Sequence, residues 1–205
     1  MNDSTENKEQ PAAPADNRVL LHACCGPWSS ACIERLRNEG KEVTVYYSDA
    51  NIAPDSEYRR RRNNARKLAE EMGVPFVEDT EADHKDWLEK VAKGFEDVPE
   101  GGARCRRCFE YNLRRTAAYA KAHGFPLFTT SLTVSPHKRS ELVFEAGRAA
   151  GGDHFLEENF KKKEGFKRSI VLAKEHNLYR QRFCGCEFSK GERVPEDAPD
   201  QPFFP

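Results

Sequence analysis

The seven cysteines are the residues whose types and spacing most clearly suggest chemistry. Six of them form three close pairs, and the seventh, Cys32, stands alone. In a C-x-x-C pair, the two intervening residues turn the chain back, so both thiolates can reach one metal ion. Adjacent cysteines cannot easily bond to each other, because the ring would strain the peptide between them. The pairs are Cys24 with Cys25, Cys105 with Cys108, and Cys184 with Cys186.

Three pairs provide more thiolates than a simple metal site needs. A tetrahedral zinc ion takes four ligands, and an iron–sulfur cluster takes four thiolates, or three when one iron stays open for chemistry. The excess indicates either a larger centre or a redox pair beside a metal site. A structural zinc held by the 105–108 and 184–186 pairs is the alternative.

Cys32 falls on a helix face and is expected to be a small buried apolar residue.

The composition favours a cytoplasmic protein without a membrane span. Of the 205 residues, 38% are hydrophobic and 33% are charged. No apolar run approaches the roughly 18 residues that a membrane-spanning helix needs, and the first residues lack the pattern of a signal peptide. Structural disulfides are rare in a reducing cytosol, so metal binding or redox chemistry explains the cysteines better.

The net charge of −1 conceals an uneven distribution. Residues 1–17 and 189–205 together hold three basic and eight acidic residues, which leaves 30 basic and 26 acidic residues between them. Both ends are polar and contain prolines, so we expect disordered tails at 1–17 and 190–205 and one catalytic domain at 18–189. The mild positive excess of this domain permits a nucleic-acid partner.

The hydrophobic pattern predicts strands that alternate with helices. A short apolar run that ends at a turn predicts a buried strand at 18–24, and a Pro start with a Gly stop predicts a helix at 27–40. Such alternation is typical of βαβ units. The predicted fold class is therefore a single-domain α/β protein with an open, mostly parallel sheet flanked by helices, a three-layer Rossmann-like or PP-loop-like arrangement. The other expected strands are 41–49, 74–79 and 125–133, and the other expected helices lie within 56–73, 84–95, 100–124, 135–152 and 166–178.

Reactive and polar residues follow the predicted strands directly. Open α/β sheets build their sites in the loops at the carboxyl ends of parallel strands. Cys24 and Cys25 follow the first strand, Asp49 follows the second, and His137 lies in the loop after the fourth. We therefore expect a metal site at the carboxyl edge of the sheet.

Five stretches of the sequence together resemble one known family. They are LLHACCGP, EYRRRR, EGGARCRRCFEYNLRRTAAYA, FTTSLTVSPHK and LYRQRFCGCEFS, and they span residues 19 to 189. Each stretch alone is weak, but their combination in this order is highly specific. On these motifs the chain resembles the cobalamin-independent epoxyqueuosine reductases, the QueH family.

The resemblance implies reduction of epoxyqueuosine, a modified base at the wobble position of certain tRNAs, to queuosine. Family members are similar in carrying a 4Fe-4S cluster, and a second, mononuclear iron is associated with the family. Carried over, Cys184 and Cys186 would be a redox-active pair or ligands of the second iron. The implied cluster ligands are Cys24, Cys25, Cys105 and Cys108.

The implied reaction removes one oxygen and consumes two electrons and two protons. Side chains do not supply such electrons, so a low-potential metal centre suits the reaction. An open iron could bind the epoxide oxygen, and a nearby acid would protonate the leaving oxide. Asp49 and His137 are the candidate acids; alternatively, Asp49 caps a helix and His137 is an exposed residue at a helix start. No flavin or nicotinamide signature identifies the electron donor.

One position departs from the family pattern. Many relatives have Cys or Asp where this chain has Trp28, and tryptophan cannot bind iron. If that position helps to hold the second iron, this chain needs another ligand, such as Asp49, or does without that metal.

Clusters of Lys and Arg are candidates for contacting tRNA phosphates, which would make binding salt-dependent. A solvated helix face is the alternative for each cluster. An expected helix start would add free N–H groups near Lys138 that favour phosphate, and nearby aromatic residues could stack on a splayed base. The candidate nucleic-acid-binding residues are Arg59, Arg62, Lys138, Arg139, Arg180 and Arg182, with Tyr58, Phe160, Phe166 and Tyr179 as the aromatics.

Two other functions remain open from the sequence. A PP-loop-like tRNA sulfur-transfer enzyme would need a phosphate loop such as S-G-G-x-D-S after the first strand, whereas ACCGPWSS places two cysteines there. A zinc-stapled tRNA-binding module would be colourless and would not need Cys24 and Cys25 at the sheet edge.

Overall fold

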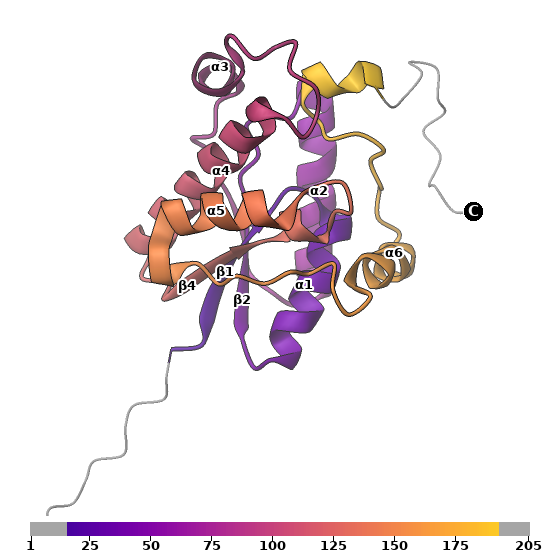
Figure 1. Ribbon diagram of the computed structural model, residues 1–205. Coiled ribbons are helices and arrows are strands. Elements are labelled where there is room, and N and C mark those ends of the chain that lie inside the picture. Colours follow the sequence, from indigo (N-terminus) through magenta and orange to yellow (C-terminus); the bar gives the residue numbers. More distant parts are fainter. Residues whose placement is uncertain (1–15, 193–205) are drawn as a thin grey trace, which may run out of the picture.

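The computed structural model describes residues 16–192, which form one α/β domain (Figure 1). A four-stranded parallel sheet with the order β3-β2-β1-β4 lies at its centre. Helices cover both faces, which confirms the predicted fold class. The strands are β1 (Arg18–Ala23), β2 (Glu42–Tyr47), β3 (Phe76–Glu78) and β4 (Leu127–Thr130).

Alternating side chains of β1 pack against a different helix layer on each face of the sheet. Val19 and Leu21 belong to a buried core shared with one layer, whereas Leu20 packs toward the other. This period of two is what a strand buried on both faces requires. The first layer contains α1 (Gly26–Asn38), α2 (Asp55–Glu71) and α6 (Gly165–Glu175), and the second contains α4 (Ala103–Ala122) and α5 (Ser140–Gly151).

The strand order creates a switch point between β1 and β4. From β1 the chain steps outward through β2 to β3, with α1 and α2 on one face. It then crosses by α4 on the other face and adds β4 to the opposite side of β1. The helices that leave β1 and β4 therefore diverge, which opens a crevice at the carboxyl ends of these strands.

The fourth strand and the helix after it are shorter than predicted. β4 ends at Thr130 because Ser131–Val134 form a 3₁₀ turn. The predicted helix start at 135 is wrong: α5 begins at Ser140, because Pro136 favours an extended Ser135, which has φ −64° and ψ 128°. Lys138 therefore precedes the helix.

The helix predicted at 84–95 is also shorter and less regular. A single α-helical turn, α3 (His84–Trp87), continues as a π-helical turn (Leu88–Ala92) and ends before Gly94, whose φ is +78°. The last described element is a 3₁₀ helix (Glu187–Glu192), whose Phe188 stacks on Trp87.

The predicted tails at 1–17 and 190–205 fall outside the described residues, except at 16–17 and 190–192. None of the helices described between residues 16 and 192 is long and apolar enough to cross a membrane.

Candidate active site

Five cysteines line one enclosed pocket at the carboxyl edge of the sheet. They come from the loop after β1, the first turn of α4 and the segment after α6. The pocket has a volume of about 30 Å³. Hereafter this is the thiol pocket, and its cysteines are Cys24, Cys105, Cys108, Cys184 and Cys186.

The remaining two cysteines lie behind the thiol pocket. The Cys25 thiol is 3.9 Å from that of Cys24 and is buried. Cys32 is fully buried in the apolar core, as predicted, and its thiol donates to the Trp28 carbonyl at 3.3 Å. All seven thiols are unbridged. Among the described residues, no three His, Cys, Asp or Glu side chains are close enough to hold a single ion.

Local backbone requirements place the first cysteine pair. Cys25 is the extended residue before α1, and Pro27 occupies the first turn of that helix, where its missing N–H costs nothing. A Cβ on Gly26 would lie 2.9 Å from the Asn64 carbonyl oxygen of α2. Glycine therefore lets α1 start against α2 and holds Cys24 and Cys25 at the end of β1.

Burial and the contact between Cys24 and Cys25 give the thiols of the site different pKa values. The hydrogen bond that Cys24 donates to Cys25 and burial together raise the pKa of Cys24. Burial alone would raise the pKa of Cys25, but hydrogen bonds from Cys24 and Gln181 lower it to about 7. Burial raises the pKa of Cys105 and of Cys108. A negatively charged thiol is thus easiest to form at Cys25.

Lys138 points into the thiol pocket rather than into solvent. Its side chain is 9% exposed, and its ammonium lies 3.6 Å from the Cys184 thiol and 5.4 Å from the centre of the Phe109 ring. Burial opposes its charge, but the negative charge of thiolates such as Cys184 and Cys105 more than compensates and raises the pKa of Lys138. Lys138 also lines the larger depression beside this pocket, and its contact with tRNA phosphate stays a prediction.

Arg104 brings a second buried cation to the same pocket. Its guanidinium donates to the carbonyls of Phe95 and Glu96 at 2.8 and 2.9 Å. Its Nε and Nη2 are buried and have no hydrogen-bond partner among the described residues. Unsatisfied donors next to several thiols form an environment suited to a negatively charged group.

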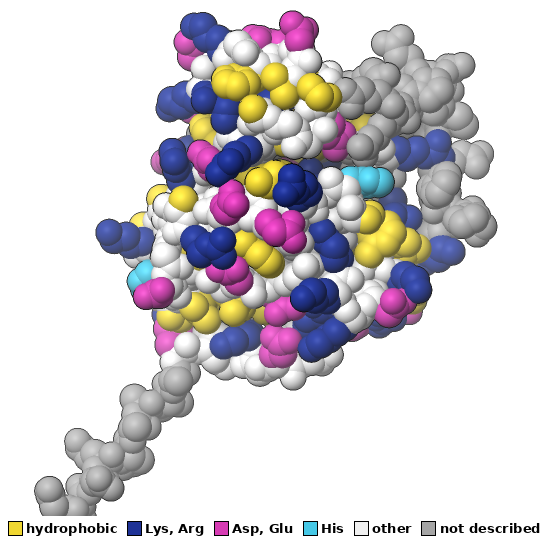
Figure 2. Space-filling model, viewed as in Figure 1, with side chains coloured by type: hydrophobic (Ala, Val, Ile, Leu, Met, Phe, Trp, Pro, Cys, Tyr) yellow, Lys and Arg dark blue, Asp and Glu magenta, His cyan; other side chains and the backbone are white. Residues whose placement is uncertain are grey.

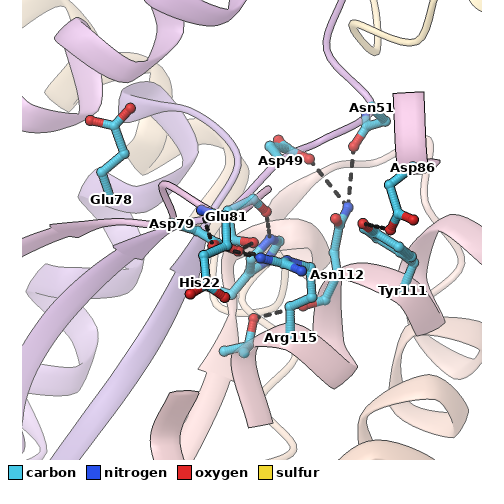
Figure 3. Close-up of polar contacts among 12 residues, drawn as sticks. His22, Asp49, Asn51, Glu78, Asp79, Glu81, Asp86, Tyr111, Asn112 and Arg115 are labelled. Atoms are coloured by element: carbon cyan, nitrogen blue, oxygen red, sulfur yellow. Dashed lines mark hydrogen bonds and ion pairs between the residues drawn. The ribbon is translucent and has the colours of Figure 1, made fainter. Parts of the chain in front are cut away.

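Asp49 lies at the polar end of the thiol pocket, after β2. Figure 3 shows the Asn112 amide donating to Asp49 at 3.3 Å and to Asn51 at 3.1 Å. Burial raises the pKa of Asp49 to about 8, although Arg61 and Lys138 act in the opposite direction. Its carboxyl group is therefore protonated at neutral pH and can donate a proton.

His22 ties together the strand ends beneath the pocket (Figure 3). Its ring nitrogens lie 2.8 Å from the Thr130 hydroxyl and 2.8 Å from the Ser48 carbonyl. A carbonyl only accepts, so Nε2 carries the proton and Nδ1 accepts from Thr130. Burial lowers the pKa of His22 to about 4, so the ring is neutral at pH 7. It joins β1 to β4 and to the end of β2.

Arg61 of α2 fixes the segment that carries the last cysteine pair. It is 2% exposed and pairs with Glu57 at 2.6 Å. Its other nitrogens donate to the carbonyls of Cys184 and Phe183 at 2.8 and 3.1 Å. A Cβ on Gly185 would lie 2.8 Å from this guanidinium. Hereafter residues 179–186 are the cysteine arm.

A larger depression of about 430 Å³ adjoins the thiol pocket. It shares Trp28, Lys138, Gln181 and Cys184 with that pocket. His137 lines this depression and is exposed, so the structure separates it from the other candidate acid, Asp49. Other residues of the wall are Glu100, Ser135, Pro136, Phe166, Arg180, Arg182 and Phe183.

The remaining predicted tRNA contacts do not form one basic surface. Exposed Arg59 pairs with Asp55, and Arg62 is half-buried and pairs with Glu78 at 3.1 Å. Arg139 is exposed before α5. On the face shown in Figure 2, Lys and Arg side chains alternate with Asp and Glu. Among the predicted aromatics, Phe160 is fully buried in the core.

Four polar residues of the site carry little or no signal in the sequence. Arg61 was hidden within a run of arginines, although it shares a buried helix face with Glu57 and Ala65 at spacings of four. Asn112 follows Cys108 by one helical turn, a spacing that could have indicated it. Arg104 and Gln181 have no comparable signal.

Together, the fold and the pocket define a Rossmann-like α/β protein with a cysteine-lined site at the switch point of its sheet. The family model described as "Epoxyqueuosine reductase QueH" matches residues 19–192, and the chain belongs to this family. It is 36% identical over 177 residues to the epoxyqueuosine reductase QueH of Histophilus somni, covering 84% of this chain and 72% of the relative.

Other comparisons agree in family and fold. The epoxyqueuosine reductase QueH of Thermotoga maritima is 34% identical over 185 residues, which cover 88% of this chain and 94% of the relative. A predicted subunit of tRNA methyltransferase from Methanocaldococcus jannaschii superposes with a TM-score of 0.53 over 77% of this chain and 74% of its own, at 15% identity. This last likeness concerns the fold alone.

Proposed function

We propose that this chain reduces epoxyqueuosine in tRNA to queuosine. The observation that carries the proposal is the convergence of the three cysteine pairs at the switch point in a chain of the QueH family. In the reaction, both C–O bonds of the epoxide break and a carbon–carbon double bond forms. Two electrons and two protons are consumed, and the oxygen leaves as water.

The donor set of the thiol pocket suits an iron–sulfur cluster. Thiolates are the usual ligands of such clusters, and the buried, unsatisfied nitrogens of Arg104 favour a negatively charged group. A 4Fe-4S cluster held here would supply the electrons at low potential. The proposed cluster ligands are Cys24, Cys25, Cys105 and Cys108, and the proposed redox pair, or ligands of a second iron, are Cys184 and Cys186.

Side chains of the pocket provide the proton and the charge balance. Asp49 is buried and protonated at neutral pH, so it is the better placed candidate to protonate the leaving oxide. Lys138 stabilises negative charge on the thiols beside it. Both side chains are buried, which strengthens both effects.

The proposed partners are a tRNA with epoxyqueuosine in its anticodon and an electron donor whose identity is open. A protein that acts on tRNA with unbridged thiols belongs in the cytoplasm, which is the proposed location.

Iron and sulfide content after purification without oxygen tests the cofactor. We expect a brown protein with a broad absorption band on the order of 400 nm, the charge-transfer band of such clusters. The band should be lost in Cys105→Ala and kept in Cys32→Ala, because Cys32 is buried away from the pocket. A colourless protein with one zinc and no sulfide would instead indicate a zinc-stapled binding module.

A further inference from the structure

The depression beside the thiol pocket has the size of a nucleoside site. Its volume of about 430 Å³ lies within the range of about 300–1,000 Å³ typical of small-molecule sites. The thiol pocket, at about 30 Å³, is too small to admit a nucleobase. Since the two share four wall residues, a base in the depression would place its substituent next to the thiols.

The walls of this depression are mainly aromatic and basic, with one carboxylate, that of Glu100. Trp28 comes from α1, Phe166 from α6 and Phe183 from the cysteine arm, three regions far apart in sequence. Arg180 and Arg182 flank them. Aromatic side chains stack on unpaired bases of any sequence, and nearby arginines attract the phosphates on either side.

Gln181 provides a hydrogen-bond acceptor at the boundary between the two spaces. The side chain of Gln181 lies beside Cys25 and lowers the pKa of that thiol. Its Oε1 is buried and has no partner among the residues the structure describes. A buried acceptor without a partner is costly, so this position favours a ligand that brings an N–H or O–H donor.

From these observations we propose that the depression binds the modified nucleobase, turned out of the anticodon loop and stacked between Trp28 and Phe166. Gln181 Oε1 accepts a hydrogen bond from the nucleoside, and the epoxide-bearing substituent reaches the thiol pocket past Cys184. The inference rests on the proposed function, because it assigns a base site to the same substrate.

Binding of two anticodon stem-loops to the metal-loaded protein tests this site. One carries epoxyqueuosine and the other an abasic nucleotide at the same position. Wild type should prefer the modified stem-loop. Phe166→Leu should reduce this preference about tenfold, the usual effect of one stacking contact, and Gln181→Met should reduce it about tenfold through loss of one buried hydrogen bond. Phe125→Leu is the matched control, since Phe125 is also half-buried but precedes β4 at the opposite edge of the sheet.

Iron content and thermal unfolding should be alike in Phe166→Leu and Phe125→Leu, which separates a binding effect from misfolding. Variants that keep the wild-type preference would overturn the base site.

The reduction assay distinguishes failure of the base site from failure of the proposed function. A wild type that binds with this preference but does not reduce the epoxide would contradict the proposed function and not the base site. Reduction by Phe166→Leu with an unchanged KM would contradict the base site alone.

Discussion

The residues around Lys138, and not its place in the sequence, determine what its charge acts on. In sequence it belongs to a basic cluster, yet its ammonium lies 3.6 Å from the Cys184 thiol in a buried pocket. Its charge opposes the rise in the pKa of Cys24 and of Cys105. The charge therefore acts on the cysteines of the pocket.

Lys138→Met should slow alkylation of the pocket thiols in the metal-free, reduced protein at neutral pH about tenfold, because the thiolate loses its cation. The rate of iodoacetamide modification at each cysteine, read by mass spectrometry, measures this. Lys161→Met is the matched control, since Lys161 donates only to the Lys138 carbonyl, at 2.6 Å. Equal rates in both variants would contradict the assigned role.

Asp49→Asn should lower the rate of epoxide reduction by about 10²–10⁴-fold, the usual contribution of a general acid, without loss of iron. Burial raises the pKa of Asp49 to about 8, so wild-type activity should fall as pH rises through that value and the acid ionises. The variant should lack this decline. A wild-type pH profile that stays flat to about pH 9 would contradict the role of Asp49.

The same carboxyl group should make stability depend on pH. Its pKa is about 8 when folded and about 3.9 when unfolded, so the folded state holds the extra proton between these values. The free energy of unfolding of the metal-free protein should therefore fall as pH rises from about 4 to about 8. Asp49→Asn should remove this part of the slope, as denaturant titrations at several pH values would measure. An unchanged slope would show that the group is not buried in solution.

At the scale of elements, the cysteine arm depends on α2. The arm has little regular structure, but Arg61 binds two of its carbonyls, and the Gly185 carbonyl accepts from the Ala53 backbone at 2.9 Å. An arginine from a regular helix thus positions a segment that lacks its own hydrogen-bond ladder. Glycine is required at 185, where φ is +102° and a side chain would meet Arg61.

Arg61→Leu should lower the free energy of unfolding by about 3–5 kcal/mol, the cost of breaking a buried ion pair. It should also speed amide hydrogen exchange within residues 179–186. Arg59→Leu, which removes an exposed pair on the same helix, should change either quantity little. If exchange in the arm is equally slow in both variants, Arg61 does not hold it.

The elements also show what the sequence could predict. All four strands were expected because apolar runs end at turns, and this placed Cys24 and Asp49 correctly at the carboxyl edge. The start of α5 was misplaced at 135, because Pro136 keeps Ser135 extended and the helix begins only at Ser140. The burial of Lys138 and Arg61 depends on packing between distant segments, which no local pattern contains.

At the scale of the whole molecule, topology explains why the three cysteine pairs meet. They are separated by up to 162 residues in sequence, between Cys24 and Cys186. The reversal of strand order at β1 and β4 opens the crevice, and the cysteine arm closes it from the other side. Strand–helix alternation predicted such a crevice, but the path of the arm after α6 was not predictable from the sequence.

Binding of tRNA should depend on salt through the exposed cations that contact its phosphates. Arg139→Gln should reduce the slope of log Kd against log salt by about one, the value for one lost phosphate contact. Arg114→Gln, on the outer side of α4 and near Glu110, is the matched control. A slope that changes equally in both variants would show that Arg139 makes no specific contact.

The most direct test of the central claim is single-turnover reduction of epoxyqueuosine in tRNA by anaerobically purified protein with a chemical reductant. Mass spectrometry of the digested tRNA measures loss of one oxygen atom from the modified nucleoside. We expect wild type and Cys32→Ala to form queuosine, and Cys105→Ala to form none. Iron-loaded wild-type protein that binds the tRNA and leaves the epoxide intact would contradict the account.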